Sequence, residues 1–289
     1  MKIDVCIATI RPGTLSDAVQ SIQRQTHRDW RLTIIGQGSD PQLVSIGNSL
    51  ARDPRIRYFH LDKKGLSAAR NKAIEVMNAE VIAFTDDDCE ADKNWLSELE
   101  TSFLDENIGM VAGPLIAPPP DRPGIGFVPT TYSLKEGGIM GANFALHART
   151  IKNVGRFDEN LGVGARFPAG EDLDYVSRVT DAAIQFFYNP NAVIRHTHGW
   201  RYGLQAVFKH KRSYALGYGA FVAKRKQAGV DFVDYEKENT RETIKKAIFA
   251  LNPKALVFSV LRAYYVRQGY LECMKNYRYD AEQGVLVAV

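Results

Sequence analysis

The first 110 residues alternate short apolar runs with stretches of helical periodicity, and this alternation limits the choice of fold more than any other feature. Strands are predicted at residues 5–8, 32–35, 56–61, 81–85 and 110–112. Helices are predicted between them, from Leu15, Leu43, Ser67 and Trp95 onward. Strands and helices that alternate in this way form βαβ units around a mostly parallel sheet. We therefore expect an α/β protein with a Rossmann-like, mostly parallel sheet flanked by helices.

The pattern becomes irregular after Gly113. A Pro- and Gly-rich stretch predicts a loop at 118–129, and a Gly-rich loop is expected before a helix that starts at Glu171. Farther on, basic and aromatic residues interleave in stretches that favour helices. The expected divisions of the chain are residues 1–113, 114–225 and 226–289. We expect the first two to belong to one domain and the third to be a basic, amphipathic helical extension.

The charge of the chain is unevenly distributed. From residue 201 onward, sixteen Lys and Arg stand against eight Asp and Glu, although the whole chain carries only +4. A basic C-terminal part of this kind predicts an acidic partner, either an anionic membrane surface or a phosphorylated substrate. Nucleic acid is not expected as a partner, because no nucleic-acid-binding motif accompanies the charge.

The cysteines and the N-terminus indicate the cellular compartment in which the protein is expected. Cys6, Cys89 and Cys273 are odd in number and lack the spacing of a disulfide framework or a zinc site, which favours a reducing compartment. The chain enters a predicted strand directly after Met1, and no apolar run reaches about 18 residues, so neither a signal peptide nor a spanning helix is expected. We expect a cytoplasmic protein, with peripheral attachment to the inner face of the membrane as an alternative.

Three consecutive aspartates, Asp86, Asp87 and Asp88, end the apolar run 81–85. Adjacent carboxylates repel one another and resist burial, so packing alone does not explain them. Hard divalent cations such as Mg²⁺ bind carboxylate oxygens and leave room for substrate phosphates. Open α/β sheets bind ligands at the carboxyl ends of their strands. The cluster therefore indicates a cation site, with an acidic turn that caps the next helix as the alternative.

Taken in order, the motifs of the chain resemble those of the family-2 glycosyltransferases over about residues 3–225. The resemblance implies the GT-A fold, with 1–113 as the nucleotide-sugar-binding half and 114–225 as the acceptor-binding, catalytic half. It also implies an inverting, metal-dependent transfer of a sugar from a nucleotide-diphosphate sugar to an acceptor hydroxyl, in polysaccharide or glycoconjugate synthesis. The expected partners are a nucleotide-diphosphate sugar, with a UDP-sugar favoured, and a glycan or lipid-linked acceptor.

The resemblance also assigns roles to residues on the donor side. Those expected to bind the nucleotide are Thr9, Arg11, Gln37, Arg70, Asp86 and Asp87. Those expected to hold Mn²⁺ or Mg²⁺ are Asp88, Asp86 and His198. We choose His198 over His196 and expect only one of the two to reach the ion. Imidazole suits Mn²⁺ better than Mg²⁺.

Gly170-Glu171-Asp172 matches the acidic motif that the family carries on the acceptor side. An inverting displacement needs a base opposite the departing diphosphate, and we assign that base to Asp172 with Glu171 in support. The alternative is that both acids only favour a helix N-terminus through its dipole. The residues expected to contact the acceptor are Gly141, Asn143 and Trp200.

One departure from the family pattern concerns the nucleotide base. Many members carry two aspartates after the second strand, and one of them contacts uracil. This chain has Gln37 in the run Gly36-Gln37-Gly38 at that place. The amide oxygen of Gln37 can accept a hydrogen bond from a pyrimidine N3–H, but the same amide suits other bases. This departure from the family pattern leaves the identity of the nucleotide base undetermined and does not affect the predicted chemistry of transfer.

The C-terminal extension and two competing functions remain as alternatives. Basic amphipathic helices lie on anionic membranes, which would suit a lipid-linked acceptor, but such helices also form homodimers or pack on their own domain. A sugar-phosphate nucleotidyltransferase would carry a Gly-rich basic loop after the first strand, whereas Ala8–Gly13 has one Gly and one Arg. An NAD-dependent oxidoreductase matches less well still, because no GxGxxG follows that strand. A non-catalytic nucleotide-sugar or glycan-binding protein is the alternative outside enzymology.

Overall fold

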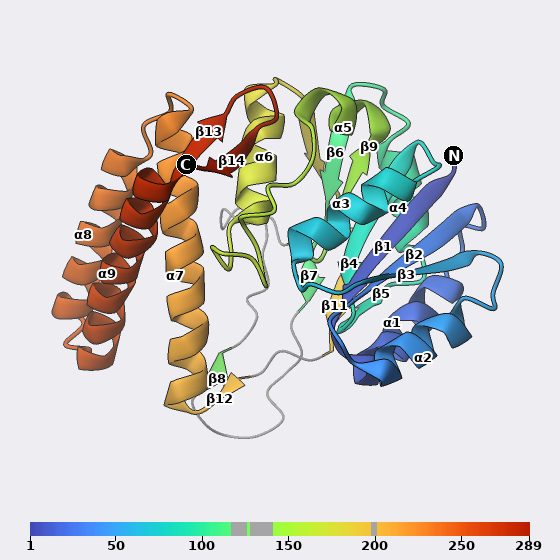
Figure 1. Ribbon diagram of the computed structural model, residues 1–289, viewed down its shortest axis with the longest axis horizontal. Coiled ribbons are helices and arrows are strands. Elements are labelled where there is room, and N and C mark those ends of the chain that lie inside the picture. The colour runs from blue at the N-terminus through green and yellow to red at the C-terminus, as the bar shows by residue number, and fades with distance from the viewer. Residues whose placement is uncertain (117–125, 128–140, 198–200) are drawn as a thin grey trace.

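The computed structural model describes residues 1–116, 126–127, 141–197 and 201–289, and Figure 1 shows a central sheet with a helical bundle beside it. Within these residues the main sheet has seven strands in the order β10-β6-β9-β4-β1-β2-β3. In chain order they are β1 (Ile3–Thr9), β2 (Trp30–Gln37), β3 (Ile56–Leu61), β4 (Val81–Asp86), β6 (Ile108–Ala112), β9 (Phe144–His147) and β10 (Gln185–Tyr188). Only β9 runs antiparallel to its neighbours β4 and β6 in this sheet. The predicted mostly parallel sheet is confirmed.

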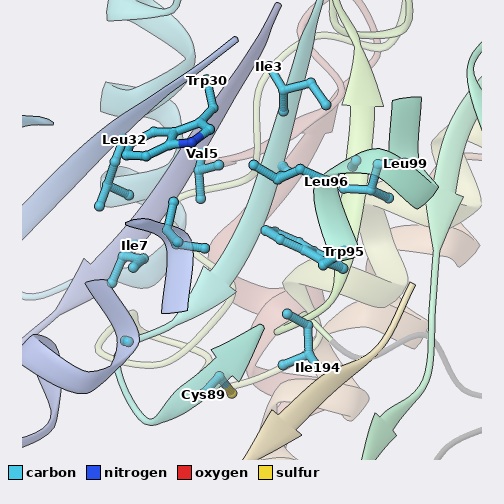
Figure 2. Close-up of a cluster of buried hydrophobic side chains, with 14 of the residues drawn as sticks. Ile3, Val5, Ile7, Trp30, Leu32, Cys89, Trp95, Leu96, Leu99 and Ile194 are labelled. Carbon is cyan, nitrogen blue, oxygen red and sulfur yellow. The ribbon is translucent and has the colours of Figure 1, made fainter. Parts of the chain in front are cut away.

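Helices cover both faces of the sheet. One face packs against α1 (Pro12–Gln23), α2 (Pro41–Leu50) and α4 (Trp95–Ser102), and the other against α3 (Leu66–Val76), α5 (Ala148–Val154) and α6 (Glu171–Asp181). Alternate residues of β1 explain this, because successive side chains of a strand point to opposite faces. Ile3, Val5 and Ile7 pack toward Trp95 of α4 (Figure 2), whereas Cys6 belongs to the core under α3 and α6.

A second, three-stranded sheet lies at the carboxyl end of β4. It joins β5 (Cys89–Ala91), β11 (Ile194–His196) and β7 (Leu115–Ile116), with β11 antiparallel to β5 and parallel to β7. The short strand β5 follows the three aspartates directly. The pairing therefore fixes a segment about a hundred residues away next to the acidic run, with His196 opposite Cys89.

The C-terminal part forms a bundle of α7 (Leu204–Gln227), α8 (Val233–Phe249) and α9 (Pro253–Asn276). The backbones of α7 and α9 approach closely where glycines face them. A Cβ on Gly219 would lie 2.0 Å from the carbonyl oxygen of Val266, and a Cβ on Gly269 would lie 2.0 Å from that of Leu216. No helix in the described part of the chain is both long and apolar enough to cross a membrane.

The extension differs from the prediction in two ways. It does not end as a helix, because β13 (Tyr277–Asp280) and β14 (Val285–Ala288) form an antiparallel hairpin. The expected boundary between 225 and 226 also falls inside the last turn of α7, which packs on α9 along its length. The bundle therefore begins with α7, and the ribbon β8 (Gly126–Phe127) and β12 (Arg201–Tyr202) leads into it.

A buried ion cluster joins this bundle to α6. Lys224 of α7 is 1% exposed, and its Nζ lies 2.9 Å from Asp158 Oδ2 and 2.7 Å from Asp174 Oδ1. The same ammonium donates to the carbonyl of Gly284 in the hairpin, and the N–H of Leu286 donates to Asp158. Buried charges are tolerated when they are paired and hydrogen-bonded, so the cluster fixes the hairpin and α7 against α6.

Replacing Lys224 with methionine is expected to lower the free energy of unfolding by about 3–5 kcal/mol, because it leaves the buried carboxylate of Asp158 without its counter-ion. Urea denaturation followed by circular dichroism measures this. Lys226→Met is the matched control in the same helix, since Lys226 and its partner Asp231 are largely exposed and their ion pair is expected to matter little. Equal stability of the two variants would show that the cluster does not hold the bundle in place.

Candidate active site

The acidic run lies where the carboxyl ends of β4 and β1 meet, because the two strands pair in parallel. Thr9 Oγ1 donates a 2.6 Å hydrogen bond to Asp87, and the Arg11 guanidinium forms an ion pair with the same carboxylate. Arg11 also lies 2.7 Å from Asp88 Oδ2. Asp87 is 2% exposed and both of its oxygens accept these bonds, so it holds Thr9 and Arg11 in place. The nucleotide contact predicted for Asp87 stays a prediction.

Strand β11 brings a histidine to the acidic run. His196 Nε2 lies 3.6 Å from Asp88 Oδ1. Asp88, Cys89 and His196 each offer one ligand atom within 4.8 Å of the others. Burial raises the pKa of the Cys89 thiol well above its ordinary value, so the sulfur stays protonated and is a poor metal ligand. His198, the predicted ligand, lies outside the described residues, and His196 is the histidine that the structure places beside Asp88.

The donor set suits a divalent cation. Carboxylate oxygens are ligands for Mg²⁺ and Mn²⁺, and a neutral imidazole suits Mn²⁺ well. Arg11 already places a positive charge against Asp88, which shows that this cluster of carboxylates is stabilised by a cation. Its side chain is about half exposed, at 49%, although the two carboxylates that it pairs with are buried. Asp88 and His196 therefore fit the divalent ion that the sequence motif implies, whereas the metal contact predicted for Asp86 stays a prediction.

Arg70 is the central cation of the site. It lies in α3, is 2% exposed, and is surrounded by the rings of three phenylalanines, of which Phe144 is 5.4 Å from the guanidinium carbon. Its Nη1 donates to Glu171 Oε1 at 3.2 Å, and its Nη2 donates to the carbonyl of Gly141 at 2.7 Å. A Cβ on Gly141 would lie 2.7 Å from Nη2, so only glycine permits this approach.

The second pair of acids lies at the start of α6. Gly170 has the left-handed φ of 93°, which turns the Gly-rich loop into the helix so that Glu171 and Asp172 form its first turn. Asp172 Oδ1 accepts the N–H of Leu173 at 2.8 Å, and Oδ2 accepts the N–H of Gly141 at 3.2 Å. These two bonds fix the orientation of the Asp172 carboxylate, which stays partly accessible.

The two groups of acids form one electrostatic unit around Arg70. Burial raises the pKa of Asp86 to about 7; Arg70 opposes the rise, whereas Asp88 and Glu171 add to it. Burial also raises the pKa of Glu171 to about 7, and the charge of Asp172 adds to that rise. The pKa of Asp172 is raised by burial as well, against the effect of Arg70. Acids from β4 and from α6 therefore interact across a single buried guanidinium.

Two residues predicted to contact ligands are hydrogen-bonded inside the protein. Gln37 is 4% exposed, and its amide oxygen accepts the N–H of Gly65 at 2.6 Å, which fixes the end of β2 to the start of α3. Asn143 is fully buried; its oxygen accepts from the Trp95 indole, and its NH₂ donates to the carbonyls of Pro114 and Ala192. Both side chains are thus engaged within the protein, and the ligand contacts predicted for them stay predictions. Trp200, the third predicted acceptor contact, lies outside the described residues.

The sequence profile of glycosyl transferase family 2 matches residues 5–146, which include β1, the acidic run and Gly141. The chain belongs to glycosyl transferase family 2. An uncharacterized glycosyltransferase of Rickettsia felis is 35% identical over 91 residues, which cover 32% of this chain and 15% of that protein. The chain spans only 13–18% of the length of the first curated relatives that it matches.

Other glycosyltransferases match over more of their length. The O-antigen chain rhamnosyltransferase RfbN of Salmonella typhimurium is 26% identical over 220 residues, which cover 69% of this chain and 68% of that protein. The mannosyltransferase PcManGT from Pyrobaculum calidifontis, solved in complex with GDP-Man and Mn²⁺, has a TM-score of 0.63 at 11% identity over 94% of this chain and 87% of that one.

S. aureus TarS 1–349 in complex with UDP-GlcNAc has a TM-score of 0.56 at 14% identity, over 100% of this chain and 97% of that one. At such low sequence identity, the similarity to these structures is evidence for the fold alone. They are GT-A glycosyltransferases, so the predicted GT-A fold is confirmed for this member of family 2.

Proposed function

We propose that the protein is an inverting, metal-dependent glycosyltransferase that moves a sugar from a nucleotide-diphosphate sugar to an acceptor hydroxyl. One observation carries the proposal: Asp86 and Asp88 at the end of β4 and Glu171 and Asp172 at the start of α6 meet around the buried Arg70. One acidic group suits a cation and the other suits a base. A reaction with an anionic leaving group on one side and an alcohol nucleophile on the other needs both.

Asp172 is the base in this proposal. Its carboxylate takes the proton of the acceptor hydroxyl as that oxygen attacks the anomeric carbon from the side opposite the diphosphate. The bond from the anomeric carbon to the phosphate oxygen breaks in the same step, and its electron pair leaves with the nucleotide diphosphate. Glu171, which is paired with Arg70, supports Asp172, and the charge of Asp172 adds to the raised pKa of Glu171. Inversion at the anomeric carbon follows from the single displacement.

Asp88, Asp86 and His196 would hold the divalent cation. When bound, the cation neutralises the charge that develops on the departing diphosphate. Arg11 is half exposed and lies against Asp88, so we propose that it turns to contact a phosphate of the donor. Thr9 is held by Asp87 beside the same edge of the sheet, where we propose that it contacts the nucleotide. These groups act by position and charge, without a covalent intermediate.

We propose a glycan or lipid-linked acceptor and a role in polysaccharide or glycoconjugate synthesis. The relative named as an O-antigen chain rhamnosyltransferase supports this, because it covers about two thirds of both chains. The related folds were solved with GDP-Man in one case and UDP-GlcNAc in the other, so both bases are to be tested, with UDP-sugars first. Of the predicted acceptor contacts, we retain Gly141, whose N–H reaches Asp172.

A donor screen tests the proposed function. The protein is incubated with UDP-, GDP- and dTDP-sugars, with Mn²⁺ and Mg²⁺ in parallel, and release of nucleotide diphosphate is measured. We expect release from one class of donor, only with a divalent ion present, and loss of release after chelation. Tight binding of a nucleotide without turnover on any acceptor would favour the non-catalytic alternative. Release of pyrophosphate from a nucleoside triphosphate and a sugar phosphate would favour the nucleotidyltransferase.

Replacing Arg70 with glutamine is expected to move the acidic limb of the pH–rate profile to higher pH. The base acts in its deprotonated form, so the rate rises as the pH climbs through the apparent pKa of the Glu171–Asp172 pair, and the pKa of Glu171 is about 7. Arg70 lowers the pKa of both acids, and its removal therefore raises them. The activity lost should be greater at about pH 6 than at about pH 8.

The control for this profile is Lys72→Gln. Lys72 lies in the same helix and pairs with Glu75 away from the site. Its profile is expected to match that of the unmodified protein. Activities at different pH values are compared within one preparation of each variant. A smaller folded fraction would lower the activity by the same factor at every pH, so it does not shift the pH–rate profile. An equal loss of activity at every pH in Arg70→Gln would contradict the electrostatic role of Arg70.

A further inference from the structure

The turn between α8 and α9 carries large apolar side chains that the protein leaves exposed. Ile248, Phe249 and Leu251 are 53%, 85% and 88% exposed, and we call these three residues the apolar tip. Val257 and Val260 of α9 continue the exposed apolar surface away from the tip. Side chains this exposed contribute little to the packing of the chain. A contiguous apolar surface of this kind marks a site of interaction.

Basic residues lie beside the apolar tip in the sequence and at the start of α7, which shares the same edge of the bundle (Figure 1). The exposed ones, which we call the basic rim, are Lys209, Lys211, Arg212, Lys246 and Lys254. The first three lie near the start of α7 and reach α9, because Lys211 Nζ is 5.5 Å from the Phe258 ring and the Arg212 guanidinium is 5.3 Å from the Tyr265 ring. The other two lie on either side of the tip. Helices from two parts of the sequence thus present one positively charged edge.

The sequence keeps acidic residues away from this edge. No Asp or Glu occurs between Asp181 and Asp231, nor between Glu242 and Glu272. The acid nearest to the tip along α8 is Glu242, and it pairs with Lys245 at 2.7 Å. Acids of α8 lie toward its other end. The basic rim therefore keeps a net positive charge that an interaction partner must match.

The positive charge of the basic rim distinguishes between two binding partners for this surface, a second copy of the chain and an anionic bilayer. A second copy of the chain in a symmetric dimer would bring the same basic rim against itself, and like charges would oppose the contact. An anionic bilayer matches both features, because its headgroups attract Lys and Arg and its interface accepts apolar side chains. We propose that the apolar tip and the basic rim together bind the surface of membranes that contain anionic lipids.

The place of this surface in the fold gives the proposal a functional consequence. In Figure 1 the α8–α9 turn and the start of α7 lie along the same lower edge of the molecule, and β1 runs toward that edge from the N-terminus. The strands therefore end on the side that would face the bilayer. If the proposed transfer reaction holds, a lipid-linked acceptor would approach from this side. Lipid binding itself does not depend on that reaction.

Co-sedimentation of the full chain with vesicles tests the proposal. Vesicles of phosphatidylcholine alone are compared with vesicles that also contain phosphatidylglycerol, at low and at high salt. We expect binding only to the anionic vesicles and weaker binding at high salt, because salt screens the attraction. Replacing Phe249 and Leu251 with serine, or Lys246 and Lys254 with glutamate, is expected to weaken binding about tenfold or more.

Matched controls use exposed residues elsewhere. Leu104→Ser removes a leucine that is 75% exposed after α4, and Lys152→Glu reverses an exposed charge on α5; neither is expected to change lipid binding. All variants change exposed side chains, so folding is retained, and transfer to a water-soluble acceptor should be unchanged in the Phe249/Leu251 variant. Equal binding to neutral vesicles, no binding to either kind, or a dimer that the tip variant converts to a monomer would overturn the proposal.

Discussion

Replacing Asp172 with asparagine is expected to reduce kcat about 10²- to 10⁴-fold, the range that a general base contributes. Asparagine keeps the shape of the side chain and one acceptor oxygen, so at least one of the bonds from Gly141 and Leu173 can persist. It cannot take a proton from the acceptor. Binding of the donor nucleotide, measured by isothermal titration, should therefore stay close to that of the unmodified protein while turnover falls.

The neighbouring acids provide the comparison for this variant. Asp181→Asn changes an acid at the far end of α6, where it pairs with Arg225, and it should leave kcat unchanged. Glu171→Gln should retain more activity than Asp172→Asn, because Glu171 serves to pair with Arg70. Wild-type turnover in Asp172→Asn, together with a large loss in Glu171→Gln, would transfer the role of base to Glu171.

Replacing Asp88 with asparagine is expected to remove the dependence of nucleotide binding on Mn²⁺ and to lower the transfer rate about a hundredfold or more. A carboxylate is a far better ligand for a hard cation than an amide, and Asp88 lies between Arg11 and His196 at 2.7 and 3.6 Å. Titration of a nucleotide diphosphate with and without Mn²⁺ measures the first effect independently of turnover.

The control for Asp88 is Asp92→Asn, four residues farther along, where the side chain is partly exposed and lies 4.0 Å from Arg195. It should keep the full response to Mn²⁺. The Asp88 and Asp172 variants are expected to differ in kind, since one loses metal-dependent binding and the other loses turnover alone. Identical behaviour of the two would contradict the division of the site into a cation side and a base side.

The sequence predicted the part of the fold that depends on local periodicity. The strands of the N-terminal half were predicted within a few residues, because each is a buried apolar run that ends at polar or turn residues; β3 matches the prediction at both ends. Strand β5 was missed, since three residues after an acidic run carry no period that can be recognised. Its pairing with β11 depends on a contact across about a hundred residues.

The sequence drew attention to the charged residues of the candidate site more readily than to residues whose place depends on hydrogen bonds. The charges of Arg70 and Asp88 act on Asp86, so the three lie in one electrostatic group as the motifs predict, and their roles stay predictions. Gln37 and Asn143 were taken as ligand contacts, yet their partners are backbone groups and a tryptophan from distant segments. No local pattern distinguishes a buried amide that links loops from one that faces a substrate.

The closing hairpin has a consequence for how the protein is made. Lys224, Asp158 and Asp174 lie in segments that leave the ribosome early, but the N–H of Leu286, 128 residues after Asp158, completes their bonding. Until β13 and β14 have been made, Asp158 lacks the hydrogen bond from Leu286, and the Lys224 ammonium lacks the carbonyl of Gly284 as an acceptor. Removing the hairpin is therefore expected to weaken the contact of α7 with α6, the helix that carries Asp172, and so to lower activity from a distance.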